Sequence, residues 1–482
     1  MSHEEAVVER ELGTKNVKSL LIKYSIAALI GQSLQMCQIT GDGFFVGNGI
    51  GQIGLATISI VYPLLVFTLA TGSLIGIGAT SISAIHLGKG EVEEARSYFG
   101  QSIVFSIILS LIIMILGLLN VENIVTFLGA SGELVKSASA YASVFFYSFP
   151  FTVTGCVFYF YVRLDEQPFI GTLALTVPAL VAIMVEYFCI FKWHLGIASS
   201  AISFGLCVGS WSLIGIYFLI NRKTVFKMKL SDFKLDFRKI LGINKTGFAS
   251  FIIQVVFAVV AIVINNLLGV YGKPVDIAAF GIINAYLLYI FSIFVTLGFT
   301  LGLQPIVSFN YGARQFARVR ECLTVSIKYT IGTMAVLTAL LFAFAHQVVS
   351  FFAGDAPDLV AATQADMKIY LLLFALGGIS FLVSGYYQAI EHNGKAIFNG
   401  CTRNIIFIIP LLFILPKFLG VTGIWAAQPI ADALSFAVAM FLVYNEIKRL
   451  KQLENESIED IIDECGTSTV VALNACETSA GN

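Results

Sequence analysis

Residues 39–96 read ITGDGFFVGNGIGQIGLATISIVYPLLVFTLATGSLIGIGATSISAIHLGKGEVEEAR, and their pattern returns at residues 263–320 without a gap. The shift between the copies is 224 residues, the distance from Gly88 to Gly312. It also pairs identical residues along the whole stretch: Val46 with Val270, Ile53 with Ile277, Tyr62 with Tyr286, Phe67 with Phe291, Gly78 with Gly302 and Arg96 with Arg320. Both copies are too long and too apolar to be repeats of a soluble protein. The chain therefore consists of two related membrane-embedded halves, and secondary transporters commonly place their site between such halves.

The composition agrees with a membrane protein. Hydrophobic residues make up 57% of the chain and charged residues 12%, with a mean hydropathy of +0.86. Soluble domains carry about 25% charged residues. The net charge of −1 excludes binding of a nucleic acid through bulk electrostatics. The eight cysteines form no CxxC pair, so we expect no metal site, no disulfide framework and no cofactor.

The apolar segments define the expected architecture. About twelve of them reach the length of roughly 20 residues that crosses a bilayer. We expect an all-α integral membrane protein with about 12 transmembrane helices in two pseudo-symmetric six-helix lobes. The expected parts are a cytoplasmic N-terminal tail (1–19), an N-lobe (20–220), a cytoplasmic linker (221–241), a C-lobe (242–447) and a disordered cytoplasmic tail (448–482).

Basic residues in short connections mark the cytoplasmic side of a membrane protein. The linker is rich in Lys and Arg, and Lys89, Arg163, Arg314 and Arg403 fall on the same side of the expected topology. The connections on the other side are poorer in basic residues. We therefore expect a multi-pass protein of the plasma (inner) membrane with both termini in the cytoplasm, and with the linker as a solvated connector.

Asp42 is the first candidate for function, because an ionisable group at membrane depth is costly. Gln35, Gln38 and Asp42 follow at spacings of three and four, which place them on one face of the first helix. A polar stripe of this kind must face water or another helix. The Asp42 carboxylate could exchange a proton or hold a small cation, or it could be hydrogen-bonded for packing alone.

Glu186 is the second candidate, near the end of the fifth apolar segment. Two close carboxylates cannot both remain ionised alone, so Asp42 and Glu186 would share a proton or clamp a cation if they converge. The alternative is that Glu186 lies at the outer interface and is simply hydrated.

The second half offers neutral polar groups. Asn266 occupies the repeat position of Asp42, and Asn265 and Gln304 can hydrogen-bond a substrate or serve helix packing. The aromatic rings of Tyr62 and Tyr286 could attract a lipophilic cation, although such rings also line ordinary lipid-facing surfaces.

Several motifs resemble the multidrug and toxic compound extrusion (MATE) family, within the superfamily that includes lipid-linked oligosaccharide flippases. They include GDGFFVGNGIGQIGLATISIVYP, LGKGEVEEAR with its echo NYGARQFARVRE, GLQPIVSFNYGA, RLDEQP and GIWAAQPIADALSF. The likeness spans about residues 10–450 and implies two six-helix lobes and drug/cation antiport. It places Asp42 at the first-helix acid, Glu186 at a fifth-helix acid that is usually Asp, and Ser203 near a sixth-helix hydroxyl. Ala182 stands where some members have Asn, which favours protons over sodium.

The leading hypothesis is a cation-coupled antiporter, with protons favoured and sodium possible, that exports amphipathic, cationic organic compounds. The coupling residues would be Asp42, Glu186 and Ser203, and the substrate-binding residues Gln35, Gln38, Tyr62, Asn265, Asn266, Tyr286 and Gln304. The partners would be a drug-like small molecule and membrane lipid. The alternatives are a lipid or metabolite flippase of the same superfamily, a channel or a non-transporting receptor. No enzymatic activity is expected.

Overall fold

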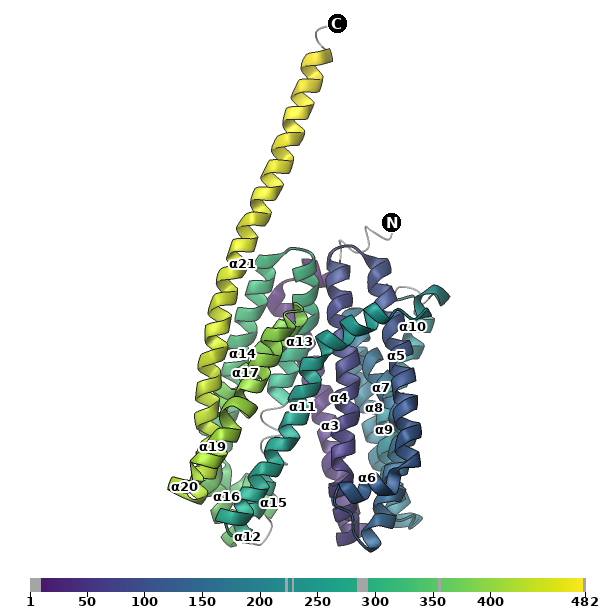
Figure 1. Cartoon of the computed structure of the whole chain (residues 1–482), viewed down its shortest axis with the longest axis vertical. Coiled ribbons are helices and arrows are strands. Elements are labelled where there is room, and N and C mark those ends of the chain that lie inside the picture. The colour runs from purple at the N-terminus through teal and green to yellow at the C-terminus, as the bar shows by residue number, and fades with distance from the viewer. Residues whose placement is uncertain (1–9, 222–223, 228, 284–293, 354–356, 480–482) are drawn as a thin grey trace.

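The structure is a computed structural model that describes residues 10–221, 224–227, 229–283, 294–353 and 357–479. These residues form two helical bundles and no strand (Figure 1). The first bundle contains α2 (Glu11–Thr14), α3 (Val17–Gly49), α4 (Gln52–Gly88), α5 (Val92–Leu119), α6 (Val121–Phe127), α7 (Glu133–Leu164), α8 (Pro168–Tyr187), α9 (Ala198–Gly209) and α10 (Ile214–Ile220). The second contains α11 (Phe237–Tyr271), α12 (Pro274–Ile282), α13 (Phe294–Gly312), α14 (Phe316–Ala343), α15 (Ala345–Ala353), α16 (Pro357–Tyr370), α17 (Phe374–Ala389), α18 (Asn393–Cys401), α19 (Ile409–Ile414), α20 (Pro416–Leu419) and α21 (Val421–Ser479).

The number of spans agrees with the expectation. Within the described residues, nine helices are long and apolar enough to cross a membrane, and α16 with α17 forms a further span bent by 56°. Helix α3 is itself 33 residues long, so both halves contain several helices of spanning length. The prediction of an all-α membrane protein in two six-helix lobes is therefore confirmed.

Each lobe begins at a capped helix. The Asn16 side chain accepts hydrogen bonds from the backbone N–H groups of Lys18 and Ser19 at the start of α3. Asp236 does the same for Arg238 and Lys239 at the start of α11. These caps satisfy donors that the first turn of a helix leaves unpaired. Helix α11 begins at Phe237, which lies inside the expected linker (221–241).

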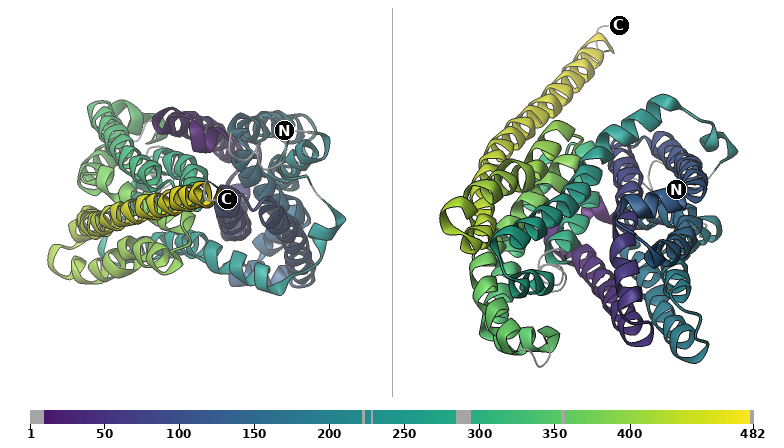
Figure 2. Two further views of the ribbon diagram at one scale, coloured as in Figure 1. Left: turned by 90° about the horizontal axis from the view of Figure 1, so that it is seen from above. Right: turned by 60° about the horizontal axis from the view of Figure 1, so that its bottom comes forward.

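Both described chain ends lie on one side of the bundle, and we call that side the terminal face (Figure 1). Near this face the backbones of the two lobes touch at glycines. A Cβ atom added to Gly88 would lie 2.0 Å from the Phe309 carbonyl oxygen, and one added to Gly312 would lie 2.0 Å from the Ile85 carbonyl oxygen. The 224-residue shift maps Ile85 onto Phe309 and Gly88 onto Gly312. The sequence repeat is therefore a spatial pseudo-two-fold, and backbone touches backbone at its centre. Figure 2 shows the two lobes from two further directions.

Both terminal segments and the linker differ from what the sequence predicted for them. The described part of the N-terminal tail is packed between the lobes, with Arg10 and Leu12 buried. The linker is packed on the first lobe rather than solvated, because Phe226 is fully buried and Asp232 pairs with Arg96 at 2.9 Å. The expected disordered tail continues α21 to Ser479 (Figure 1). Residues 448–464 contain no Gly or Pro and are rich in Lys, Glu, Leu and Ile, which explains the continued helix.

Candidate functional site

Asp42 and Glu186 meet inside the first lobe. Asp42 lies on α3, Glu186 lies in the last turn of α8, and both side chains are buried, with 5% and 0% of their surface exposed. Helix α3 packs along α8, and the two carboxyl groups are close enough to interact. The structure therefore places Glu186 inside the lobe and not at the outer interface.

The polar stripe of α3 faces the protein interior. Gln35 and Gln38 are 8% and 0% exposed. Neither polar atom of the Gln38 amide has a hydrogen-bond partner among the described residues. Buried polar groups are nearly always paired, so this amide has unused hydrogen-bonding capacity one helical turn from Asp42.

The immediate partner of Asp42 is Ser200, which the sequence analysis missed. The Ser200 hydroxyl on α9 donates a hydrogen bond to Asp42 Oδ1. No described protein group donates to either carboxyl oxygen of Glu186. The buried Tyr141 on α7 lies beside Ser200 and Asp42. Two buried carboxyls with a single hydroxyl donor among the described residues require a positive charge or a proton to stabilise them.

Ser203 is turned toward a different group. Its hydroxyl donates to the Ala182 carbonyl oxygen of α8 at 2.6 Å, which fixes α9 against α8. Ser200 and Ser203 are one helical turn apart, so both lie on one side of α9. That shared face was the signal in the sequence, but spacing alone could not show which hydroxyl reaches Asp42.

The remaining described candidate residues lie on other helices than this pair. Tyr62 on α4 and the neighbouring Asn265 and Asn266 on α11 have exposed side chains in the structure. Gln304 on α13 is buried and lines a cavity of about 20 Å³ between the lobes. Tyr286 lies outside the described residues. The role of these neutral polar residues in substrate binding therefore stays a prediction.

Comparison with known proteins identifies the family. A sequence model of the MatE family matches residues 16–188 and 246–414, which are in the first and second lobes respectively. This chain belongs to the MATE family. Among its curated relatives, the multidrug export protein MepA of Staphylococcus saprophyticus is 26% identical over 439 residues, which cover 91% of this chain and 96% of that protein. MepA of Staphylococcus aureus strain MW2 is 26% identical over 440 residues, with the same coverage.

Solved structures share the MATE fold. An outward-facing conformation of a multidrug resistance MATE family transporter superimposes with a TM-score of 0.86 at 21% identity, over 94% of this chain and 99% of that one. A superfamily transporter from Pyrococcus furiosus, described by the reversed polarity of its binding pocket, superimposes with a TM-score of 0.84 at 21% identity, with the same coverage.

A buried ion pair lies in the C-lobe of this MATE protein. Arg403 Nε lies 2.6 Å from Asp432 Oδ1, Asp432 is fully buried, and Gln428 Nε2 lies 3.3 Å from the same oxygen. The sequence pattern predicted that Arg403 is one of the cytoplasmic cations. That assignment was wrong, because the side chain is 11% exposed and lies within an apolar helical segment, where it neutralises Asp432. Arg403 therefore carries no information about orientation.

Proposed function

We propose that this MATE protein is a multidrug efflux transporter that exchanges a cation for an amphipathic, cationic organic compound by alternating access. The observation that carries the proposal is the Asp42–Glu186 pair. Two adjacent buried carboxyls require a compensating proton or cation. A cationic substrate that competes for the same charge would displace the ion, and this competition is the physical basis of antiport.

Protons are the favoured coupling ion. A bound metal cation needs several oxygen ligands, whereas a proton needs one. Ala182 contributes no side-chain oxygen, and the Ser203 hydroxyl already donates to the backbone of α8. Only Ser200 adds a hydroxyl to the two acids. Sodium stays the alternative coupling ion.

The terminal face is proposed to be cytoplasmic. Lys89, Arg314 and Lys395 lie in or next to its loops, and basic residues concentrate on the cytoplasmic side of membrane proteins. With that orientation the lobes are packed together toward the cytoplasm, which corresponds to an outward-facing state.

The test is transport by purified protein in liposomes under separately imposed proton and sodium gradients. Tetraphenylphosphonium, a permanently charged lipophilic cation, serves as substrate. We expect uptake or efflux driven by the proton gradient, and we expect Asp42→Asn to abolish the driven component. Glu122→Gln, which removes an exposed acid on α6, is the matched control and should transport normally.

Other outcomes would contradict the proposal. Undiminished driven transport in Asp42→Asn would remove the acid from the coupling mechanism. Lipid scrambling without drug movement in the same liposomes would favour the flippase alternative, and unitary currents would favour a channel.

A further inference from the structure

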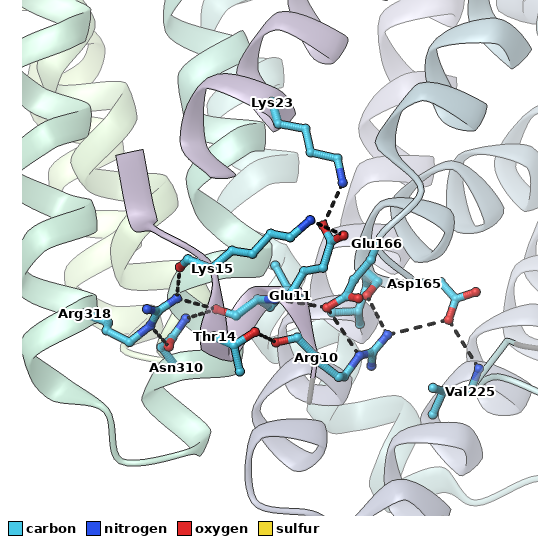
Figure 3. A network of polar contacts seen from close by, with 12 residues as sticks. Arg10, Glu11, Thr14, Lys15, Lys23, Asp165, Glu166, Val225, Asn310 and Arg318 are labelled. Carbon is cyan, nitrogen blue, oxygen red and sulfur yellow. Dashed lines mark hydrogen bonds and ion pairs between the residues drawn. The ribbon is translucent and has the colours of Figure 1, made fainter. Parts of the chain in front are cut away.

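The N-terminal segment, residues 10–15, lies between the two lobes at the terminal face (Figure 3). On the N-lobe side it is held by the loop between α7 and α8. Arg10 Nη2 lies 3.6 Å from Asp165 Oδ1, and Arg10 Nε lies 3.6 Å from Glu166 Oε1. The Arg10 side chain is only 5% exposed. A buried arginine paired with two acids is a firm anchor, since removing either side would leave uncompensated buried charge.

On the C-lobe side the same segment is held through its backbone. The Leu12 carbonyl oxygen accepts hydrogen bonds from Asn310 Nδ2 at 2.9 Å and from Arg318 Nη2 at 3.0 Å. Arg318 Nη2 also donates to the Lys15 carbonyl oxygen at 2.7 Å. The Leu12 N–H donates in the opposite direction, to Glu166 Oε1 at 3.0 Å. One residue therefore joins the lobes through its two backbone groups.

The two C-lobe side chains that hold the segment, Asn310 and Arg318, also bond to each other. Arg318 Nε donates to Asn310 Oδ1 at 2.8 Å, so the amide and the guanidinium are fixed against each other (Figure 3). Gly13 lies against the ring of Phe309, where an added Cβ atom would be 3.0 Å from a ring carbon. The segment therefore packs closely on the C-lobe, and the Leu12 side chain is fully buried.

The N-lobe loop shows strain consistent with this role. Glu166 has a φ of 65°, a left-handed conformation that disfavours residues other than glycine. In that conformation its carboxylate reaches both Arg10 and the Leu12 N–H. Asp165 also accepts from the Tyr217 hydroxyl at 2.7 Å and from the Val225 N–H at 3.3 Å. The loop therefore fastens the N-terminal segment and the start of the linker together.

A small cavity lies between the lobes next to this segment. It has a volume of about 20 Å³ and is lined by residues of both lobes: Thr80, Ser81, Phe160, Arg163, Leu164, Leu301, Gln304, Pro305 and Ser308. A space of this size accommodates about one water molecule. Leu164 precedes the Asp165 loop, and Ser308 precedes Phe309, so the lining runs directly into the residues that hold the segment. Nothing as large as a drug passes between the lobes here.

We infer that residues 10–15 form a clasp that keeps the terminal entrance between the lobes closed, and that this clasp releases Asn310 and Arg318 whenever the lobes part at that face. The inference rests on the proposed function only in assuming alternating access. Release is expected on the C-lobe side. The clasp continues covalently into α3 and is ion-paired to the N-lobe, whereas its C-lobe bonds end on neutral carbonyl oxygens.

The first test is thiol accessibility of the cavity. Ser81→Cys is introduced after replacement of the eight native cysteines, and a membrane-impermeant maleimide is supplied from the terminal face. Arg318→Gln and Asn310→Ala should each speed labelling by about tenfold, because each removes hydrogen bonds that exist only while the lobes are closed. Arg320→Gln is the matched control. Arg320 lies on the same helix but pairs with Glu454 at 3.1 Å, and its loss should leave the labelling rate unchanged.

The second test is the distance between the lobes. Spin labels at Lys89→Cys and Gly394→Cys report on the terminal face, and labels at Phe127→Cys and Phe344→Cys report on the opposite face. Release of the clasp should lengthen the first distance and shorten the second, a reciprocal change that general loosening would not produce. Unchanged labelling and distances in folded Arg318→Gln and Asn310→Ala, or equal effects of Arg320→Gln, would overturn the inference. Neither measurement uses a drug or an ion gradient, so failure of the proposed antiport leaves the result interpretable.

Discussion

Replacing Gly312 by alanine should open the terminal face of this transporter. Gly312 ends α13 and lies against the backbone of α4, where an added Cβ atom would be 2.0 Å from the Ile85 carbonyl oxygen. Ordinary van der Waals contact begins at 3.4 Å. Backbone lies on both sides of the contact, so no side-chain rotation can relieve the overlap. The lobes must separate locally by about 1.4 Å, the difference between these two distances.

The size of the effect follows from two opposing terms. Alanine is a better helix former than glycine by about 1 kcal/mol, so each helix by itself should not be weakened. Overpacking of a close contact costs about 1–3 kcal/mol, and this cost falls only on the state in which the lobes are closed. A free-energy difference of that size changes the ratio of two conformations by roughly 5- to 150-fold. Gly88→Ala strains the same pseudo-symmetric contact, so the double variant should shift the ratio by less than the product of the single shifts.

The assay is the labelling rate of Ser81→Cys from the terminal face, together with drug transport in liposomes. Gly312→Ala should label faster and transport more slowly, with little change in thermal stability. Gly332→Ala is the control, since an added Cβ atom on α14 meets nothing within 4 Å. Equal labelling of the Gly312 and Gly332 variants would refute the idea that glycine contacts close this face.

Three further predictions concern charge and orientation. Asp42→Asn and Glu186→Gln should each abolish substrate-induced ion release. The double variant should be little worse than either single variant, because two interacting buried carboxyls titrate as one unit; independent, additive losses would contradict a shared site. Arg403→Leu should lower the free energy of unfolding in detergent by about 3–5 kcal/mol, because it leaves the buried Asp432 charge unpaired. Adding Asp432→Leu should restore most of the lost stability. A double variant as unstable as Arg403→Leu would show that the lost ion pair does not cause the destabilisation. A cysteine at the exposed Leu235 should react with a membrane-impermeant thiol reagent in inverted vesicles but not in intact cells, and rapid labelling of intact cells would reverse the proposed orientation.

The architecture of this protein could be predicted from the sequence because its signals are local or periodic. Apolar segments of spanning length and an ungapped 224-residue repeat require only the order of residues along the chain. The polar stripe of α3 is equally local, since helical spacing places Gln35, Gln38 and Asp42 on one face without knowledge of any other helix. The repeat even pairs Gly88 with Gly312, although the sequence did not show that these two glycines touch backbone.

Only the tertiary structure decided which groups meet across that framework. Ser200 reaches Asp42 over 158 positions, and periodicity could not select it over Ser203, which bonds to α8 instead. The N-terminal residues looked like a free tail because their partners are remote: Leu12 bonds to residues 154 and 298 positions away. Arg403 looked like a loop cation until its buried partner Asp432 was in view. A sequence period shows which face of a helix is polar, but the identity of its partner depends on how distant helices pack, and this packing is a property of the whole fold.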